Sequence, residues 1–395
     1  MSKWQELDRK YMMHTIDRVP VTLVRGEGAR VWDDEGRVYL DFVAGIAVNS
    51  LGHCHPVVVE ALTEQARTLI QVSGWFHTIP QIRLAQLLVE NSCLDRTFFC
   101  NSGAEATEGA VKLARRYGHL KLKGAYEVIT ARNSFHGRTL LMTAATGQDK
   151  LQKPYLPLPP GFKHADYNNV DAIRAATTDM TCAVMLEPVQ GEGGVNVPDD
   201  DYLAGVRAWC DEKGILLILD EVQTGIGRIG SLFGYQEYGI EPDIMSLAKG
   251  LGSGIPIGAF LAKEEAAVFA PGEHGSTFGG NPVTCAAAAA TVGFIIENDI
   301  PANVRKVGRH LLDGLNGLRR KYSFVTDVRG RGLLTAIEFE TDIARTAATA
   351  CLERGLLVNL LKPNALRLIP PLTIGMEEVD EALEILDRVL AGITT

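Results

Sequence analysis

The strongest constraint on the fold is a regular alternation of short apolar runs and longer helix-like stretches along the middle of the chain. The apolar runs have the length and residue types of buried strands, and the stretches between them, such as residues 105–118 and 202–213, have helical spacing. Strands that alternate with helices form a mostly parallel, doubly wound α/β sheet. The predicted strands are residues 96–100, 127–131, 183–187, 216–220, 244–246 and 258–262.

The segments on either side of this region predict structure of another kind. Residues 21–43 alternate short β segments with turns, and helices follow at about 56–71 and 80–91. An alanine-rich stretch after residue 281 begins a long helical region that continues to about residue 322, before short strands and helices. We therefore predict an N-terminal segment that joins a small domain (1–60), a large α/β domain (61–285) and a C-terminal small α+β domain (286–395).

Composition and charge exclude several classes of protein. Hydrophobic residues make up 46% of the chain and charged residues 22%, which is enough apolar material for a large core. The net charge of −9 argues against a nucleic-acid-binding protein, and no apolar run reaches the roughly 18–20 residues that span a bilayer. The polar N-terminus does not have the pattern of a signal peptide, so we expect a cytoplasmic protein with no membrane partner.

The cysteines predict neither a disulfide framework nor a metal site. The chain has seven, an odd number, scattered without a C-x-x-C pair, which favours a reducing compartment. The nearest approach to a metal cluster is the run 52–56, Gly-His-Cys-His-Pro, and no second ligand cluster follows it. We interpret this run as a turn before a helix and expect no metal.

Ligand sites of open α/β sheets lie at the carboxyl ends of the strands, so the residues that follow each predicted strand are the candidates for function. Ser102, Gly103 and Ala104 follow the first strand and open a helix. Small residues at a helix start allow backbone N–H groups to reach an anion such as phosphate. Ordinary helix capping by Ser102 explains the same pattern.

The next two strand ends carry an aromatic residue, an arginine and two acids. Phe135 and Arg138 flank a glycine, which suits a planar ring and a carboxylate, although a surface turn has equal weight and His136 fits a packing role. Glu187 ends a strand, and Glu192 follows in a glycine-rich turn. A carboxylate pair of this kind occurs in glycoside hydrolases, but no aromatic-rich segment supports a sugar cleft.

The sharpest features are an acid and a lysine at two later strand ends. The apolar run 216–219 ends in Asp220 and Glu221, so at least one carboxylate lies at the ligand edge of the sheet. It resembles a Walker-B strand, but the matching phosphate-binding loop is missing, which argues against an NTPase. Lys249 leaves a buried strand into a glycine-rich turn, too late in the sheet for a dinucleotide fingerprint, so we discount NAD.

Lysine and aspartate at strand ends, together with a phosphate site, fit pyridoxal phosphate. A desolvated lysine has a lowered pKa, which suits imine formation with an aldehyde. An aspartate next to the pyridinium nitrogen keeps the ring an electron sink. Lys249 and Asp220 are the candidates for these two roles.

With these motifs in place, the chain resembles the class III aminotransferases of fold type I along essentially its whole length, and within them most closely the N-acetylornithine aminotransferases. Three segments are highly specific in combination, and two more favour the narrower group. The class-specific segments are residues 101–106, 219–228 and 275–282, and those of the narrower group are residues 21–28 and 135–139.

The resemblance implies a role for each candidate residue. Lys249 and Asp220 are expected to be catalytic, with Gln223 as donor to the phenolic oxygen of the cofactor and Phe135 stacked on its ring. Ser102, Gly103 and Ala104 are expected to bind the phosphate together with Thr277 of the other subunit, which implies a homodimer with shared active sites. Arg138 and Ser276 match substrate-binding positions. Arg367 matches the arginine that holds the α-carboxylate of glutamate, and Glu192 the acid that masks it.

One departure from the family pattern bears on the substrate. Ornithine δ-aminotransferases have a tyrosine that recognises the free α-amine of ornithine, where this chain has Ile46. An acylated nitrogen needs no such partner, so the resemblance implies transfer of the δ-amino group of N2-acetylornithine to 2-oxoglutarate, in arginine biosynthesis. Succinylornithine, ornithine and 4-aminobutyrate aminotransferases are the alternatives within the class, and a catalytically silent ligand-binding protein is the alternative outside it.

Overall fold

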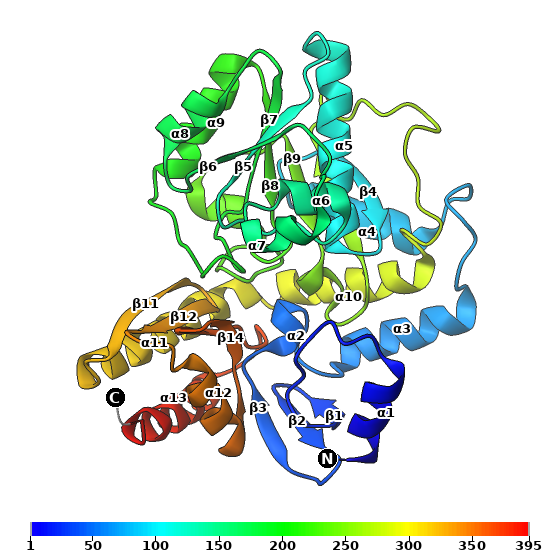
Figure 1. The fold of residues 1–395 in the computed structure, drawn as a ribbon. Helices are drawn as coiled ribbons and strands as arrows, with labels where there is room; N and C mark the ends of the chain where they lie inside the picture. The colour runs from blue at the N-terminus through cyan, green and yellow to red at the C-terminus, as the bar shows by residue number, and fades with distance from the viewer. Residues whose placement is uncertain (1, 394–395) are drawn as a thin grey trace.

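A seven-stranded sheet forms the centre of the protein, which is described by a computed structural model covering residues 2–393 (Figure 1). The strand order is β4-β10-β9-β8-β7-β5-β6, and β10 runs antiparallel to both of its neighbours while the others are parallel. This confirms the predicted mostly parallel α/β sheet. The strands are β4 (Arg96–Cys100), β5 (Glu127–Ala131), β6 (Phe162–Ala165), β7 (Thr181–Leu186), β8 (Leu216–Asp220), β9 (Ile244–Leu247) and β10 (Gly258–Ala262).

Strand β6 is the one strand of this sheet that the periodicity of the sequence misses. It lies at the edge of the sheet, is half-buried and carries a lysine and a histidine, so it lacks the continuous apolar run of the central strands. Helices cover the sheet, the longest being α5, which packs on β9 and β10. The covering helices are α5 (Gly103–Lys121), α6 (Leu140–Ala145), α7 (Asp149–Gln152), α8 (Val170–Ala176) and α9 (Tyr202–Lys213).

Helix α10 (Pro282–Glu297) crosses the middle of the molecule below the large sheet in Figure 1. Its alanine-rich sequence allows close packing against α3 (Pro56–Thr68) and α4 (Ile79–Glu90). The predicted single helical region is in fact two helices, because Asp299 has a left-handed backbone and caps α11 (Ile300–Lys321) through the backbone N–H of Ala302. No single helix of residues 2–393 is both long and apolar enough to cross a membrane; α10 and α11 combine that length and apolar character only when taken together, across a 70° bend.

Two four-stranded sheets form the remainder. In the first, β13 from the C-terminal part pairs in parallel with β3, so the two ends of the chain share one sheet. The second has the order β11-β12-β15-β14 and packs on α11, with α12 and α13 close by (Figure 1). These elements are α1 (Lys3–Tyr11), β1 (Leu23–Glu27), β2 (Arg30–Asp33), β3 (Val38–Asp41), α2 (Ala44–Ala47), β11 (Val325–Arg331), β12 (Leu334–Phe339), α12 (Ala344–Glu353), β13 (Leu356–Leu357), β14 (Asn359–Lys362), β15 (Ala365–Leu368) and α13 (Met376–Ala391). The domain boundaries at residues 60 and 285 stay a prediction.

Candidate functional site

A cavity of about 390 Å³ lies where the loops after β4, β5, β7, β8 and β9 converge. These loops follow the carboxyl ends of the parallel strands, which is the expected place for a ligand. The predicted site residues that line the cavity are Ser102, Gly103, Ala104, Phe135, Arg138, Glu192, Asp220, Gln223 and Lys249.

Lys249 enters the cavity from the first position of a short 3-10 turn, Lys249–Gly252. Burial lowers the pKa of its ammonium, and the charge of Arg367 adds to this effect while Glu192 opposes it. The glycine that follows is required by close packing, because a Cβ on Gly250 would lie 2.5 Å from the Ser50 hydroxyl. The glycine-rich sequence therefore marks a tightly packed turn.

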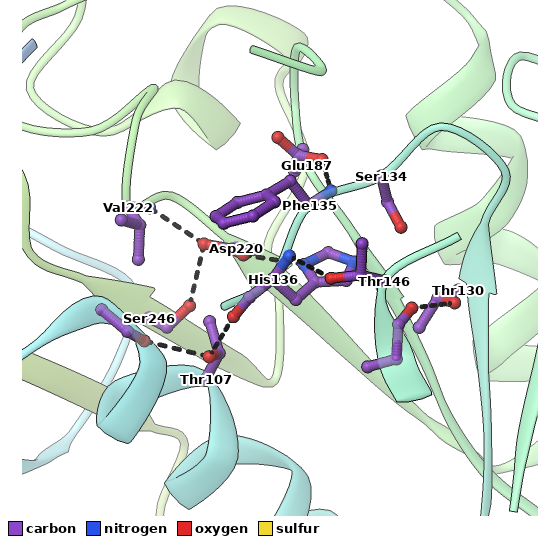
Figure 2. A network of polar contacts seen from close by, with 12 residues as sticks. Thr107, Thr130, Ser134, Phe135, His136, Thr146, Glu187, Asp220, Val222 and Ser246 are labelled. Carbon is purple, nitrogen blue, oxygen red and sulfur yellow. Dashed lines mark hydrogen bonds and ion pairs between the residues drawn. The ribbon is translucent and has the colours of Figure 1, made fainter. Parts of the chain in front are cut away.

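Asp220 is held at the end of β8 by three hydrogen bonds (Figure 2). Its Oδ1 accepts from the Val222 N–H at 3.1 Å and from the Ser246 hydroxyl at 3.3 Å. Its Oδ2 lies 2.8 Å from Nδ1 of His136, which is fully buried. Burial alone would lower the pKa of His136, but the hydrogen bond and charge of Asp220 outweigh it and raise that pKa.

His136 is the residue that sequence reasoning left undecided between packing and chemistry. Its backbone is fixed on both sides, because its N–H donates to the Thr146 hydroxyl at 2.9 Å and its carbonyl accepts from the Thr107 hydroxyl at 2.6 Å (Figure 2). The only signal in the sequence was its position beside Phe135 after a strand. Its partner, 84 residues away, is visible only in the folded chain.

The neighbouring acid, Glu221, faces away from the cavity. Its two carboxylate oxygens accept from the backbone N–H groups of Gly234 and Tyr235. Burial raises the pKa of this carboxyl to about 7, although the two hydrogen bonds work against that shift. Of the two acids at the end of β8, Asp220 therefore lines the cavity, and Glu221 binds the backbone of the following loop.

Glu187 joins two parts of the cavity wall. Its carboxylate accepts from the Phe135 N–H at 3.0 Å and from the Gly191 N–H at 3.2 Å. Burial raises its pKa to about 7. The aromatic ring of Phe135, which points into the space beside Asp220 in Figure 2, is thereby connected to the turn that carries Glu192.

Glu192 meets Arg367 although the two lie 175 positions apart. Its Oε1 accepts from Nη1 of Arg367 at 2.8 Å and from Nε2 of Gln223 at 3.1 Å, and lies 3.9 Å from Nζ of Lys249. Burial alone would raise the pKa of Glu192, but the charges of Arg367 and Lys249 and the hydrogen bonds lower it to about 2. The pair is therefore ionised and closed across one side of the cavity.

The start of α5 forms another side of the cavity. Ser102 is the N-cap, and its hydroxyl accepts from the Glu105 N–H at 3.2 Å. A Cβ on Gly103 would lie 2.9 Å from Val222, so glycine allows the helix start to approach the strand ends closely. Arg138 is exposed at the opposite rim, with its guanidinium 5.3 Å from the centre of the Phe135 ring.

Three predicted residues do not line this cavity: Arg367, which contacts the lining residue Glu192, and Ser276 and Thr277. Ser276 accepts hydrogen bonds from Gly279 and Asn101, and Thr277 is exposed. Ile46, the position expected to bear on the substrate, lies in α2, whose four residues all have positive φ, and Val48 of the same segment lines the cavity.

The residues present fit the pyridoxal phosphate that the sequence resemblance implies. Backbone N–H groups at the N-terminus of α5 are positioned for a phosphate, and the Phe135 ring and Val222 are suited to the two faces of an aromatic ring. A lysine with a lowered pKa and a fixed carboxylate face the same space. The donor set supplies a partner for each polar group of the cofactor.

Comparison with known proteins finds relatives along nearly the whole chain. The family described as aminotransferase class-III matches residues 11–390. The acetylornithine aminotransferase of Caldanaerobacter subterraneus subsp. tengcongensis is 53% identical over 387 residues, which cover 98% of both proteins. Among solved structures, the ornithine aminotransferase of Toxoplasma gondii ME49 has a TM-score of 0.94 at 35% identity, covering 98% of this chain and 94% of that one. The acetylornithine aminotransferase of Elizabethkingia anophelis has a TM-score of 0.88 at 35% identity, covering 99% and 98%.

Proposed function

The chain belongs to the class III aminotransferases, and we propose that it transfers the δ-amino group of N2-acetylornithine to 2-oxoglutarate, giving N-acetylglutamate 5-semialdehyde and glutamate. The observation that carries this proposal is the closed pair of Glu192 and Arg367 beside Lys249. A site with a maskable arginine can accept one substrate whose amine is far from its carboxylate and another whose amine is adjacent to it. The names of the relatives and Ile46 in place of tyrosine support N2-acetylornithine as the first substrate.

Pyridoxal phosphate, on which this family depends, supplies an aldehyde that takes up the amino group and a ring that accepts electrons. The N-terminus of α5, with Ser102, Gly103 and Ala104, would hold its phosphate. Phe135 would stack on the ring, Gln223 would donate to its phenolic oxygen and Asp220 would face its nitrogen. His136, hydrogen-bonded to Asp220 from behind, keeps that carboxylate in one orientation.

Lys249 would hold the cofactor covalently and, once released, move the proton at the substrate carbon. A lowered pKa leaves a larger fraction of the amine neutral, and a neutral amine is what both roles require. The left-handed backbone of Lys249 and the packed turn behind it limit the directions that the side chain can take.

The two substrates would be distinguished by which arginine is available. With the pair of Glu192 and Arg367 closed, Arg138 at the rim takes the distant carboxylate of acetylornithine. With the pair open, Arg367 takes the α-carboxylate of glutamate. A charge pair in a partly desolvated cleft can bias these states by about 1–3 kcal/mol, which corresponds to tenfold or more discrimination.

Glu192→Ala is expected to impair the half-reaction with acetylornithine and to improve the half-reaction with glutamate. The substitution leaves Arg367 without a carboxylate partner, although Gln223 and Asn359 still accept from it. Arg367 then competes for the wrong end of acetylornithine, while glutamate no longer displaces a carboxylate. The ratio of the two rates should fall about tenfold or more. Single-turnover absorbance measures both, because each amine donor converts the cofactor in the same direction. Equal effects on the two donors would contradict this role of Glu192.

A homodimer is part of the proposal. Ser276 and Thr277 lie outside this chain's own cavity, and in a homodimer they would contribute to the active site of the partner subunit. Exposed apolar side chains occur in this segment, at Phe278, and in the segment after α3, at Trp75 and Phe76, and Trp75 is 92% exposed. The Gln71 side chain donates to the Thr277 carbonyl, so these side chains belong to one surface. An apolar surface of this kind favours burial against a second subunit. The cytoplasmic location stays a prediction.

The substrate is tested by half-reaction rates with four amine donors. We expect N2-acetylornithine to react faster than ornithine and 4-aminobutyrate by about tenfold or more, because Ile46 offers no polar partner to a free α-amine. Succinylornithine is the competitor that differs only in its acyl group. A faster reaction with ornithine would contradict the proposed substrate, and no change of visible absorbance with any donor would leave only a silent binding protein.

A further inference from the structure

The sheet that carries Arg367 presents a second arginine in the same row. Across the antiparallel strands β11, β12, β15 and β14, Arg329 pairs with Ala336, Ala336 with Arg367, and Arg367 with Asn359. Residues directly opposite in antiparallel strands project from the same face of a sheet. Arg329 and Arg367 therefore project from one face of this sheet, with the small side chain of Ala336 between them.

Each of these two arginines binds the turn that carries Glu192. Arg367 holds the Glu192 side chain, as described above, and is itself aligned by Asn359, which accepts from its Nε at 3.1 Å. Arg329 donates from Nε to the backbone carbonyl of Gly194 at 2.9 Å. One row of the sheet thus contacts the turn at its side chain and at its backbone.

The guanidinium of Arg329 is fixed by two carboxylates. Its Nη1 lies 2.6 Å from Oδ2 of Asp327, and its Nη2 lies 2.8 Å from Oε2 of Glu338. All three nitrogens of the Arg329 side chain therefore have partners, which hold its guanidinium in one orientation. The two carboxylates balance the positive charge, so Arg329 acts on the turn mainly through geometry.

The backbone of the turn is closely packed against neighbouring segments. A Cβ on Gly191 would lie 2.0 Å from the Gln223 side chain, and one on Gly193 would lie 2.3 Å from the Asn133 carbonyl. Gln190 and Asn196 bridge the base of the turn through both backbone hydrogen bonds. The glycines around Glu192 therefore allow the turn to pack closely.

We infer that Arg329 is a positioning residue that fixes the backbone under Glu192, so that the Glu192–Arg367 pair opens and closes by rotation of the Glu192 side chain alone. This inference rests on the proposed function, in which that pair separates the two half-reactions. Without Arg329 the turn is released from the sheet, the pair closes less often and Arg367 is unmasked. The acetylornithine half-reaction depends on the closed pair, so we expect its rate to fall more than the rate with glutamate.

The test is Arg329→Met, measured as the ratio of single-turnover rates with N2-acetylornithine and with glutamate. We expect the ratio to fall about fivefold or more, with the visible spectrum of the bound cofactor unchanged. The matched control is Arg331→Met on the same strand, because Arg331 lies near Asp200 and Glu237 and not at the Glu192 turn. Its ratio should stay within about twofold of the wild type.

The same substitution in a Glu192→Ala protein distinguishes a positioning role of Arg329 from a general structural effect. In a Glu192→Ala protein the side chain that Arg329 positions is gone, so adding Arg329→Met should not change the ratio further. An unchanged ratio in the single variant, or an equal fall in the Glu192→Ala background, would overturn the inference. If Arg329→Met does not fold, Arg329→Lys is measured in the same way, since one ammonium cannot hold both carboxylates and the Gly194 carbonyl. An unchanged ratio there would overturn it too.

Failure of the inference can be told apart from failure of the proposed function. If the wild-type protein reacts with another ω-amine and not with acetylornithine, the proposed substrate is wrong, and the same ratio is then measured with that amine. If acetylornithine reacts well and the ratio of the two rates is unchanged by Arg329→Met, the proposed function stands and the positioning role is wrong.

Discussion

Lys249→Ala is expected to reduce turnover by at least about 10⁴-fold, because covalent attachment of the cofactor and proton transfer at the substrate carbon both depend on this amine. The protein should still fold. The Lys249 side chain is 20% exposed, and its nearest carboxylate, Glu192, lies 3.9 Å away and keeps its stronger pairing with Arg367. Truncation therefore leaves no unpaired buried charge, and alanine at the same left-handed φ adds no strain that lysine does not already have.

The matched control is Lys263→Ala. Its side chain has a similar exposure of 22%, and it pairs with Glu241 at 3.4 Å, outside the cavity. Turnover and circular dichroism are measured on both variants, and borohydride reduction followed by peptide mass spectrometry locates the attached cofactor. We expect the added mass on the Lys249 peptide of the wild type and of Lys263→Ala. A Lys249→Ala protein with near-native turnover would rule out Lys249 as the catalytic lysine.

Asp220→Asn is expected to reduce turnover by about 10²- to 10³-fold while the protein keeps its fold and much of its cofactor. An opposite charge nearby shifts a pKa by roughly 1–3 units, so loss of the carboxylate lowers the protonated fraction of the ring nitrogen accordingly. The amide oxygen can still accept from Val222 and Ser246. The amide NH₂ would face Nδ1 of the buried His136 and can donate to it only when that nitrogen is unprotonated, so we expect a modest loss of thermal stability beside the main damage to the rate and to the visible spectrum.

The control lies one residue further along the chain. Glu221→Gln removes the same charge, but this side chain accepts from Gly234 and Tyr235 and does not line the cavity. Its amide NH₂ would oppose one of those N–H groups, at a cost of about 1–3 kcal/mol. We expect turnover within about threefold of the wild type at low temperature and a Tm lower by about 1–4 °C. A wild-type rate for Asp220→Asn, or an equal loss of rate in Glu221→Gln, would show that the wrong acid has been assigned.

The sequence by itself predicted the α/β sheet and the edge at which ligands bind. Both follow from local order, because an apolar run of strand length must be buried and the residue after it must emerge at one edge. For this reason the order of residues along the chain was enough to single out Lys249 and Asp220, and both line the cavity. The strand ends also gave Ser102, Gly103, Ala104, Phe135, Arg138 and Glu192 as candidates. The resemblance to the family assigned their roles and added Gln223, Ser276, Thr277 and Arg367, and these roles stay predictions.

The sequence did not show where the side chain of Glu221 goes, and it left His136 between packing and chemistry. It also did not show what the glycines around Glu192 pack against. Each of these questions depends on what lies opposite the residue, and the partner is far along the chain: Gly234 for Glu221, Asp220 for His136 and Gln223 for Gly191.

Only the tertiary structure decided how the parts of the site meet. Glu192 and Arg367 come from different sheets, and Arg329 joins them only through the register of β11, β12 and β15. Local periodicity determines which face of a strand is buried, because the side chains alternate every two residues. It does not determine which other surface covers that face, since that choice comes from the packing of distant segments against one another.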